Sequence, residues 1–162
     1  TMGMQPIVGY NFGAQKIDRV KQTLRLGIIS GVVITSSGFV ICEFFPHAVS
    51  ALFTDSDELI NLAVEGIRLA VLMFPFVGAQ IVIGNFFQSI GKAKISIFLS
   101  LTRQLLYLLP CLLLFPQWWG LKGVWISMPV SDALAFVTAV ISLMIYIKKV
   151  SKEHPIANKV AE

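Results

Sequence analysis

The stretch "ISIFLSLTRQLLYLLPCLLLF", residues 95–115, decides the fold, because nearly every residue in it is apolar. Its length matches the roughly 20 apolar residues that a helix needs to cross a hydrocarbon core about 30 Å thick. Three further runs have similar length and composition, at residues 26–45, 70–90 and 124–147. The sequence therefore predicts four full transmembrane helices, preceded by the end of another spanning helix.

The overall composition supports a membrane protein. The 162 residues are 56% hydrophobic and only 14% charged, and their mean hydropathy is +0.77. Soluble domains are about 45–50% apolar and about 25% charged, because a small globule needs polar cover. The connections between the runs are short, so neighbouring helices must be antiparallel. The expected fold is an all-α, integral-membrane, antiparallel helix bundle.

The chain divides into three parts by this reasoning. Residues 1–25 are expected to hold the end of a spanning helix and a basic cytoplasmic loop, residues 26–147 the four transmembrane helices, and residues 148–162 a basic cytoplasmic tail. The opening at Thr1, followed at once by "MQPIVGYNFGA", reads like the end of an element. We therefore expect the chain to be a piece of a longer protein.

Basic residues set the orientation of the bundle. They cluster before the first run, between the second and third runs, and after the fourth run: Lys16, Arg19, Lys21, Arg25, Lys92, Lys94, Lys148, Lys149, Lys152 and Lys159. An antiparallel bundle brings these clusters to one side, which the positive-inside rule makes cytoplasmic. Topology thus accounts for most of the 13 basic residues, and a nucleic-acid partner is not expected.

Arg103 belongs to a polar stripe on the third run. Ser96, Ser100, Arg103, Gln104, Tyr107 and Cys111 recur at three- and four-residue spacing. On a helix this spacing places them on one face, which should face the bundle or a wet cavity. The alternative is that the Arg103 stem reaches back to the cytoplasmic headgroups. That alternative leaves Gln104 and Tyr107 unexplained.

Asp132 is the one acidic residue well inside an apolar run, within "WISMPVSDALAF". Carboxylates inside membranes commonly serve proton or cation relays, so Asp132 is the candidate for ion coupling. The structural alternative is a carboxyl group satisfied by hydrogen bonds from Ser127, Ser131 or a neighbouring helix. Counted from the cytoplasmic side, Asp132 lies about 21 Å deep and Arg103 about 12 Å deep. This difference argues against a direct bond between them and leaves a bridge through a water molecule or Gln104 open.

The second run carries the other candidate site residues. Pro75 removes an internal hydrogen bond and predicts a kink or hinge. The possible lining of a substrate path comprises Met73, Phe76, Gln80, Asn85 and Gln88. The amides among them suit adhesion between helices as well as a substrate path.

Small residues recur along one face of the first run: Gly27, Gly31, Thr35, Gly38 and Cys42. Such a face allows two helix backbones to approach closely. Both cysteines lie inside apolar runs and His47 has no convergent partners, so neither a disulfide nor a metal site is expected. No resident cofactor is expected either.

Three segments carry a resemblance to a known family. "GMQPIVGYNFGAQKIDRVKQTLRL", "FFQSIGKAKISIFLSLTRQLLYLLP" and "GLKGVWISMPVSDALAF" resemble, in this order, the C-terminal half of bacterial multidrug and toxic compound extrusion (MATE) transporters. The resemblance implies twelve spanning helices in two six-helix lobes. The chain would then hold the end of helix 8 and helices 9–12, and its partners would be the bilayer and the missing N-terminal lobe.

The resemblance also implies a function. Members export small amphipathic or cationic compounds in exchange for Na⁺ or H⁺ by rocking two lobes around a central cleft, in the bacterial inner membrane. Some members carry an acid in helix 10, where this sequence has amides instead, so both coupling ions stay open. A lipid-linked oligosaccharide flippase and a non-transporting membrane scaffold are the alternatives. An enzyme is not expected, because the sequence shows no nucleophile–base pair, His cluster or phosphate loop.

Overall fold

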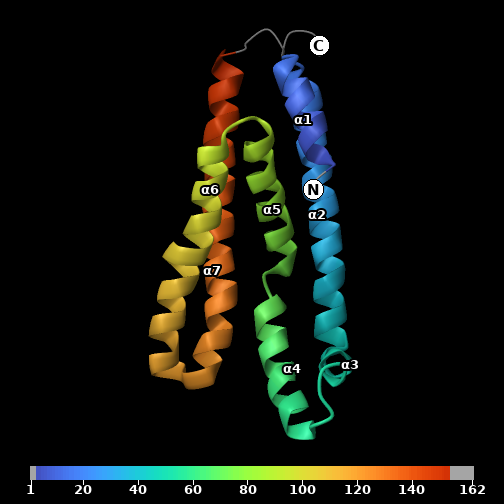
Figure 1. Ribbon diagram of the computed structural model, residues 1–162, viewed down its shortest axis with the longest axis vertical. Coiled ribbons are helices and arrows are strands. Elements are labelled where there is room, and N and C mark those ends of the chain that lie inside the picture. The colour runs from blue at the N-terminus through green and yellow to red at the C-terminus, as the bar shows by residue number, and fades with distance from the viewer. Residues whose placement is uncertain (1–2, 154–162) are drawn as a thin grey trace.

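The computed structural model describes residues 3–153, and its long helices lie side by side along one axis (Figure 1). Within these residues the chain is helical throughout apart from short connections, and contains no strand. The helices are α1 (Met4–Gly13), α2 (Ile17–Phe44), α3 (Pro46–Ala51), α4 (Asp57–Val71), α5 (Phe74–Ser89), α6 (Ala93–Leu101), η1 (Thr102–Leu108) and α7 (Leu109–Glu153). The predicted all-α membrane bundle is confirmed.

The helix labelled α7 consists of two antiparallel arms. Gly120 has φ 56° and ψ −135°, values outside the helical region, and at this residue the chain reverses at the bottom of Figure 1. A side chain is disfavoured at positive φ, which explains glycine at this turn. Residues 109–119 form the first arm and continue the third apolar run. Residues 121–153 form the second arm and contain the fourth.

The four spans follow from these helices. α2 and the stretch Ala93–Val150 are each long and apolar enough to cross a membrane. Because Ala93–Val150 reverses at Gly120, it makes two passes. α4 and α5 together pass the same test as a pair bent by 49°. α1 lies beside the start of α2 (Figure 1), and its role as the end of a preceding span stays a prediction.

The basic segments differ from the expected loop and tail. α2 begins at Ile17, so Arg19, Lys21 and Arg25 lie on its first turns. The second arm of α7 likewise continues through Lys148 and Lys149. Lys and Arg are good helix formers, and α2, at about 42 Å, is longer than the hydrocarbon core, so its end can carry charge outside the lipid. Residues 154–162 of the predicted tail lie outside the described residues.

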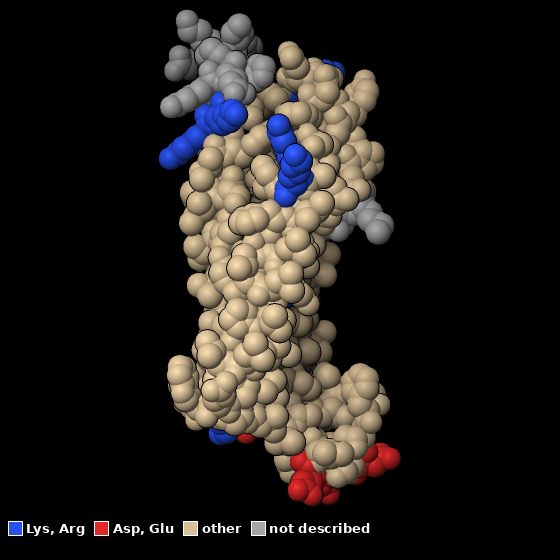
Figure 2. Space-filling model, turned by 60° about the vertical axis from the view of Figure 1, so that its left-hand side comes forward, with Lys and Arg blue, Asp and Glu red and all other residues tan. Residues whose placement is uncertain are grey.

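The charge separation predicted from the sequence is visible on the surface. Figure 2 shows most of the visible Lys and Arg atoms at one end of the molecule and Asp and Glu, with a small basic patch, at the other, with a long belt almost free of charge between them. The basic end holds the α1–α2 turn, the α5–α6 turn and the end of α7, as Figure 1 shows. This arrangement is the one that the positive-inside rule requires of a multi-pass membrane protein.

α5 is the central helix of the bundle. Val82, Ile83, Phe86 and Phe87 are buried on it, against Val8 of α1 and other core residues of α2 and α7. The Phe87 ring packs edge-on against Tyr146 with the centroids 5.5 Å apart. Aromatic pairs in this geometry add about 0.5–1.5 kcal/mol beyond burial. The core therefore lies toward the basic end, where α5 meets α1, α2 and α7.

The break between α4 and α5 lies directly before Pro75. α4 ends at Val71, and α5 starts at Phe74 with Pro75 in its first turn. The proline ring clashes with the carbonyl group four residues earlier, which here belongs to Val71. The predicted kink is thus present as a bend of 49° between the two helices. Motion at this bend stays a prediction.

Residues Thr102–Leu108 form a π-helix, η1, inside the third span. The prediction of one continuous helix with α-helical periodicity through this segment is wrong. π-helical turns are rare and occur frequently at functional sites. Arg103 and Tyr107 both lie in η1, and both bond to the second arm of α7.

Candidate functional site

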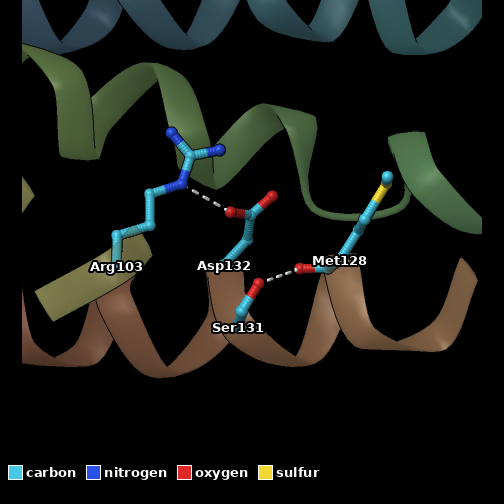
Figure 3. Close-up of polar contacts among 4 residues, drawn as sticks. All are labelled: Arg103, Met128, Ser131 and Asp132. Carbon is cyan, nitrogen blue, oxygen red and sulfur yellow. Dashed lines mark hydrogen bonds and ion pairs between the residues drawn. The ribbon is translucent and has the colours of Figure 1, made fainter. Parts of the chain in front are cut away.

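Arg103 and Asp132 form an ion pair in the interior of the bundle. Arg103 Nε donates to Asp132 Oδ1 at 2.8 Å, joining η1 to the second arm of α7 (Figure 3). The Asp132 side chain is 9% exposed, whereas the Arg103 side chain is 34% exposed. A carboxylate buried among apolar helices needs such a partner, since an isolated charge there is costly.

The prediction that depth keeps the two residues apart is wrong. Arg103 does lie nearer the basic end, but Figure 3 shows its stem leaning along the bundle toward Asp132. The length of the arginine side chain thus covers the difference in depth between the two backbones. The same direction contradicts the snorkelling alternative, which required the stem to reach back toward the cytoplasmic headgroups.

The neighbouring serines do not satisfy Asp132. Ser131 donates its hydroxyl to the Met128 carbonyl oxygen at 2.8 Å (Figure 3), and Ser127 donates to the Gly123 carbonyl oxygen at 2.7 Å. Serine hydroxyls on helices often bond back to their own backbone in this way. Of the alternative partners expected for Asp132, the serines are therefore wrong, whereas a neighbouring helix does supply the partner through Arg103 of η1.

A second bond joins the same two elements. The hydroxyl oxygens of Tyr107 and Thr138 lie 2.8 Å apart. Thr138 also donates to the Leu134 carbonyl oxygen at 2.9 Å in its own helix. With that proton committed, Tyr107 is the donor to Thr138. Tyr107 therefore contributes to the contact between helices.

A polar groove lies between α5 and α6 beside the ion pair, with a volume of about 270 Å³. Arg103 lines this groove, and Figure 3 shows its guanidinium group directed toward α5. Its lining residues are Gln80, Ile81, Gly84, Asn85, Gln88, Ser96, Leu99, Ser100 and Arg103. The groove unites the amides predicted on the second run with the serines predicted on the third.

Gln80 stands out among the groove residues. It is 7% exposed, and its Oε1 atom is buried without a hydrogen-bond partner. Asn85 differs, because its Nδ2 donates to the Ile81 carbonyl oxygen at 3.0 Å within α5. A buried acceptor without a partner costs about 1–3 kcal/mol, and such groups often mark a place where a ligand or ion binds.

The remaining predicted site residues lie apart from this groove. Met73 is half-buried at the break between α4 and α5, and Gln104 is exposed. Phe76 packs against Phe136 of the second arm with ring centroids 5.2 Å apart. The structure thus brings together Gln80, Asn85, Gln88, Arg103 and Asp132, and it separates Met73, Phe76 and Gln104 from them.

Metal-binding side chains do not gather near the groove. Among residues 3–153, no three His, Cys, Asp or Glu side chains lie close enough to hold a metal ion together. Cys42 and Cys111 are free thiols. What the site offers a ligand is one ion pair, several amides and two serine hydroxyls, which suits reversible binding of a charged or polar group.

Comparison with known proteins identifies the family. The MatE family model matches residues 1–113, which is more than half of the chain. The chain belongs to the MatE family. Among curated relatives, the chain is 28% identical over 125 residues to the probable multidrug resistance protein NorM of Pseudomonas aeruginosa, covering 73% of this chain and 26% of that protein. It is 23% identical over 135 residues to the FAD transporter of Shewanella oneidensis, covering 81% of this chain and 29% of that protein.

Solved structures agree with this assignment. An inward-facing MATE family multidrug resistance transporter matches with a TM-score of 0.86 at 19% identity, over 92% of this MatE chain and 35% of that chain. An outward-facing conformation matches with a TM-score of 0.85 at 19% identity, over 92% and 34%. This MatE chain thus has the fold of part of these transporters. It spans about a third of the length of each.

Proposed function

We propose that this MatE chain forms one wall of a multidrug efflux antiporter in a bacterial inner membrane. The whole protein would export amphipathic or cationic compounds in exchange for Na⁺ or H⁺ by alternating access. The observation that carries this proposal is the buried Arg103–Asp132 pair beside a groove of amides. The likeness to the P. aeruginosa protein, named as a multidrug resistance protein, supports the choice of substrates.

The ion pair provides a two-state element for coupling. Arg103 occupies one carboxylate oxygen of Asp132 and Figure 3 shows the other pointing away from it. A proton or Na⁺ that neutralises Asp132 weakens its attraction to Arg103, and the guanidinium group then becomes available to the groove. Because the pair bridges η1 and the second arm of α7, breaking it changes how these helices pack.

The match of this chain to both an inward-facing and an outward-facing transporter structure supports motion of the lobe as a rigid body. This part of the chain superimposes on the inward-facing and outward-facing structures almost equally well, with TM-scores of 0.86 and 0.85. Equal agreement with both is expected if a lobe moves as one body during alternating access. The scaffold alternative requires no such motion and assigns no role to the polar groove.

An anionic substrate is the second candidate. The S. oneidensis relative is named as an FAD transporter, and Arg103 lines the groove with its guanidinium group directed at α5. A guanidinium group pairs well with phosphate or carboxylate. Arg103 is the only cation among the described lining residues of this groove, which argues against the highly anionic cargo of a lipid-linked oligosaccharide flippase.

The test is drug efflux by the full-length protein in drug-sensitive cells. Asp132→Asn and Arg103→Ala should each reduce efflux of cationic drugs at equal expression, while Lys122→Ala, which removes an exposed pair with Glu65 at the outer end, should not. If both inner variants expel drugs like the wild type, the pair is packing only. If the wild type exports an anionic dye and not cationic drugs, the second candidate is correct.

A further inference from the structure

A second, larger groove lies at the cytoplasmic end of the bundle. Its volume is about 630 Å³, within the range of about 300–1,000 Å³ that small-molecule sites occupy. It lies between the α5–α6 turn, which contributes Lys92, and the end of the second arm of α7, which contributes Lys149. No lining residue is shared with the polar groove beside Arg103. The cytoplasmic groove is therefore a separate site.

The charge of this groove is positive. Lys92 and Lys149 are its charged lining residues, and none of the described residues that line it is acidic. Lys94 follows Lys92 closely in the sequence, and Lys148 directly precedes Lys149. Figure 2 shows Lys and Arg side chains standing out at this end above an uncharged surface. An anionic group at the level of the lipid headgroups would be attracted here.

The rest of the groove is apolar and opens onto an exposed flank of α6 and α7. Phe98 of α6 and Ile145 of α7 line it and are 53% and 64% exposed. Ile97 and Ile141 on the same two helices are also exposed. Ser142 also lines the groove, but its hydroxyl is committed to the Thr138 carbonyl oxygen. A soluble anion would gain nothing from these apolar walls, whereas an acyl chain would.

We propose that this cytoplasmic groove binds an anionic phospholipid of the inner leaflet. Its headgroup phosphate lies between Lys92 and Lys149, and its acyl chain runs along Phe98 and Ile145. Basic pockets between transmembrane helices on the cytoplasmic side favour such lipids by charge and by apolar contact together. The occupant is a lipid and not free phosphate, because most of the residues that line the groove are apolar and would contact an acyl chain.

The experiment is native mass spectrometry of the full-length protein taken from nanodiscs with equal amounts of phosphatidylglycerol and phosphatidylcholine. The wild type should retain phosphatidylglycerol in preference. Lys92→Gln and Lys149→Gln should each lower this retention about fivefold, the effect of one basic side chain at an anionic surface. Lys92→Arg should preserve it. Lys16→Gln, which changes a cytoplasmic charge outside the groove, is the matched control.

Two further experiments test whether the ligand is a lipid or a soluble phosphate, and whether the apolar wall contributes to binding. Glycerol phosphate in excess should not displace the lipid, and Ser142→Trp, which fills the groove without changing charge, should reduce retention. Equal retention of both lipids by the wild type would overturn the proposal. So would an equal loss in Lys16→Gln and Lys92→Gln, or displacement by glycerol phosphate. Melting temperatures measured in detergent without lipid identify any variant that is simply misfolded.

Discussion

Gly78 of α5 lies directly against Gly31 of α2, so that a Cβ atom at position 78 would sit 2.5 Å from the Gly31 carbonyl oxygen. No side chain fits there unless the two helices separate. Gly78→Ala should therefore destabilise the protein by about 1–3 kcal/mol, the usual cost of overpacking. Unfolding in increasing SDS, followed by far-UV circular dichroism, measures this loss.

Gly84 provides the matched control on the same helix. A Cβ atom at Gly84 meets nothing within 4 Å. Gly84→Ala should therefore leave stability unchanged or raise it by about 0.5–1 kcal/mol, because alanine is the better helix former. Equal loss of stability in both variants would show that the α2–α5 contact is not as close as described.

The Arg103–Asp132 pair should behave as a coupled unit. Arg103→Ala leaves a buried carboxylate without its partner, so this single change should cost more stability than Arg103→Ala combined with Asp132→Asn. Polar contacts between membrane helices contribute about 0.6 kcal/mol on average and up to about 1.7 kcal/mol, so we expect a coupling energy near 1–2 kcal/mol. A double-mutant cycle in SDS unfolding gives the value. Strict additivity of the single effects would show that the two side chains do not bond.

Much of the fold follows from the sequence, because lipid imposes strong rules. A run such as residues 95–115 must be helical, since no water is present to bond its backbone. The positions of Lys92 and Lys94 then predict the orientation of the hairpin, and Figure 2 shows basic side chains gathered at one end of the molecule. The close approach of helices at Gly31 was also expected from its small-residue face.

The site was only partly predictable, because side-chain direction decides it. The sequence marks both Arg103 and Asp132 as unusual for an apolar run, but counting helical rise places only their backbones and not the end of the arginine side chain. The π-helix at Thr102–Leu108 has no periodicity signal that separates it from an α-helix in an apolar run. Gln80 could be placed on a polar side of its helix, whereas its unpartnered oxygen depends on what faces it across the groove.

Pro75→Ala should straighten the break between α4 and α5. Without the proline ring, the Val71 carbonyl group can accept the hydrogen bond that continues the helix. We expect the 49° bend to decrease, stability to be kept or raised, and efflux to fall if motion at the break is needed. Spin labels on α4 and α5 of the full-length protein report the angle through their separation. Unchanged efflux with a straightened helix would remove the hinge from the transport mechanism.

Membrane sidedness can be tested by cysteine labelling. In a background without Cys42 and Cys111, Lys94→Cys should resist membrane-impermeant maleimides added to intact cells, whereas Lys122→Cys, which lies just past the Gly120 turn at the opposite end, should react. Both should react after permeabilisation. Labelling of position 94 from outside would reverse the orientation and with it the cytoplasmic placement of the lysine-lined groove.

The most direct test of the account is ion flux in proteoliposomes that contain the full-length protein. Drug added to one side should drive a counterflow of H⁺ or Na⁺ in the wild type. Asp132→Asn should reduce this flux at least about tenfold, a change of about 1.4 kcal/mol, while drug binding is kept. The same ion flux per drug molecule in Asp132→Asn and wild type would contradict a coupling role for the Arg103–Asp132 pair.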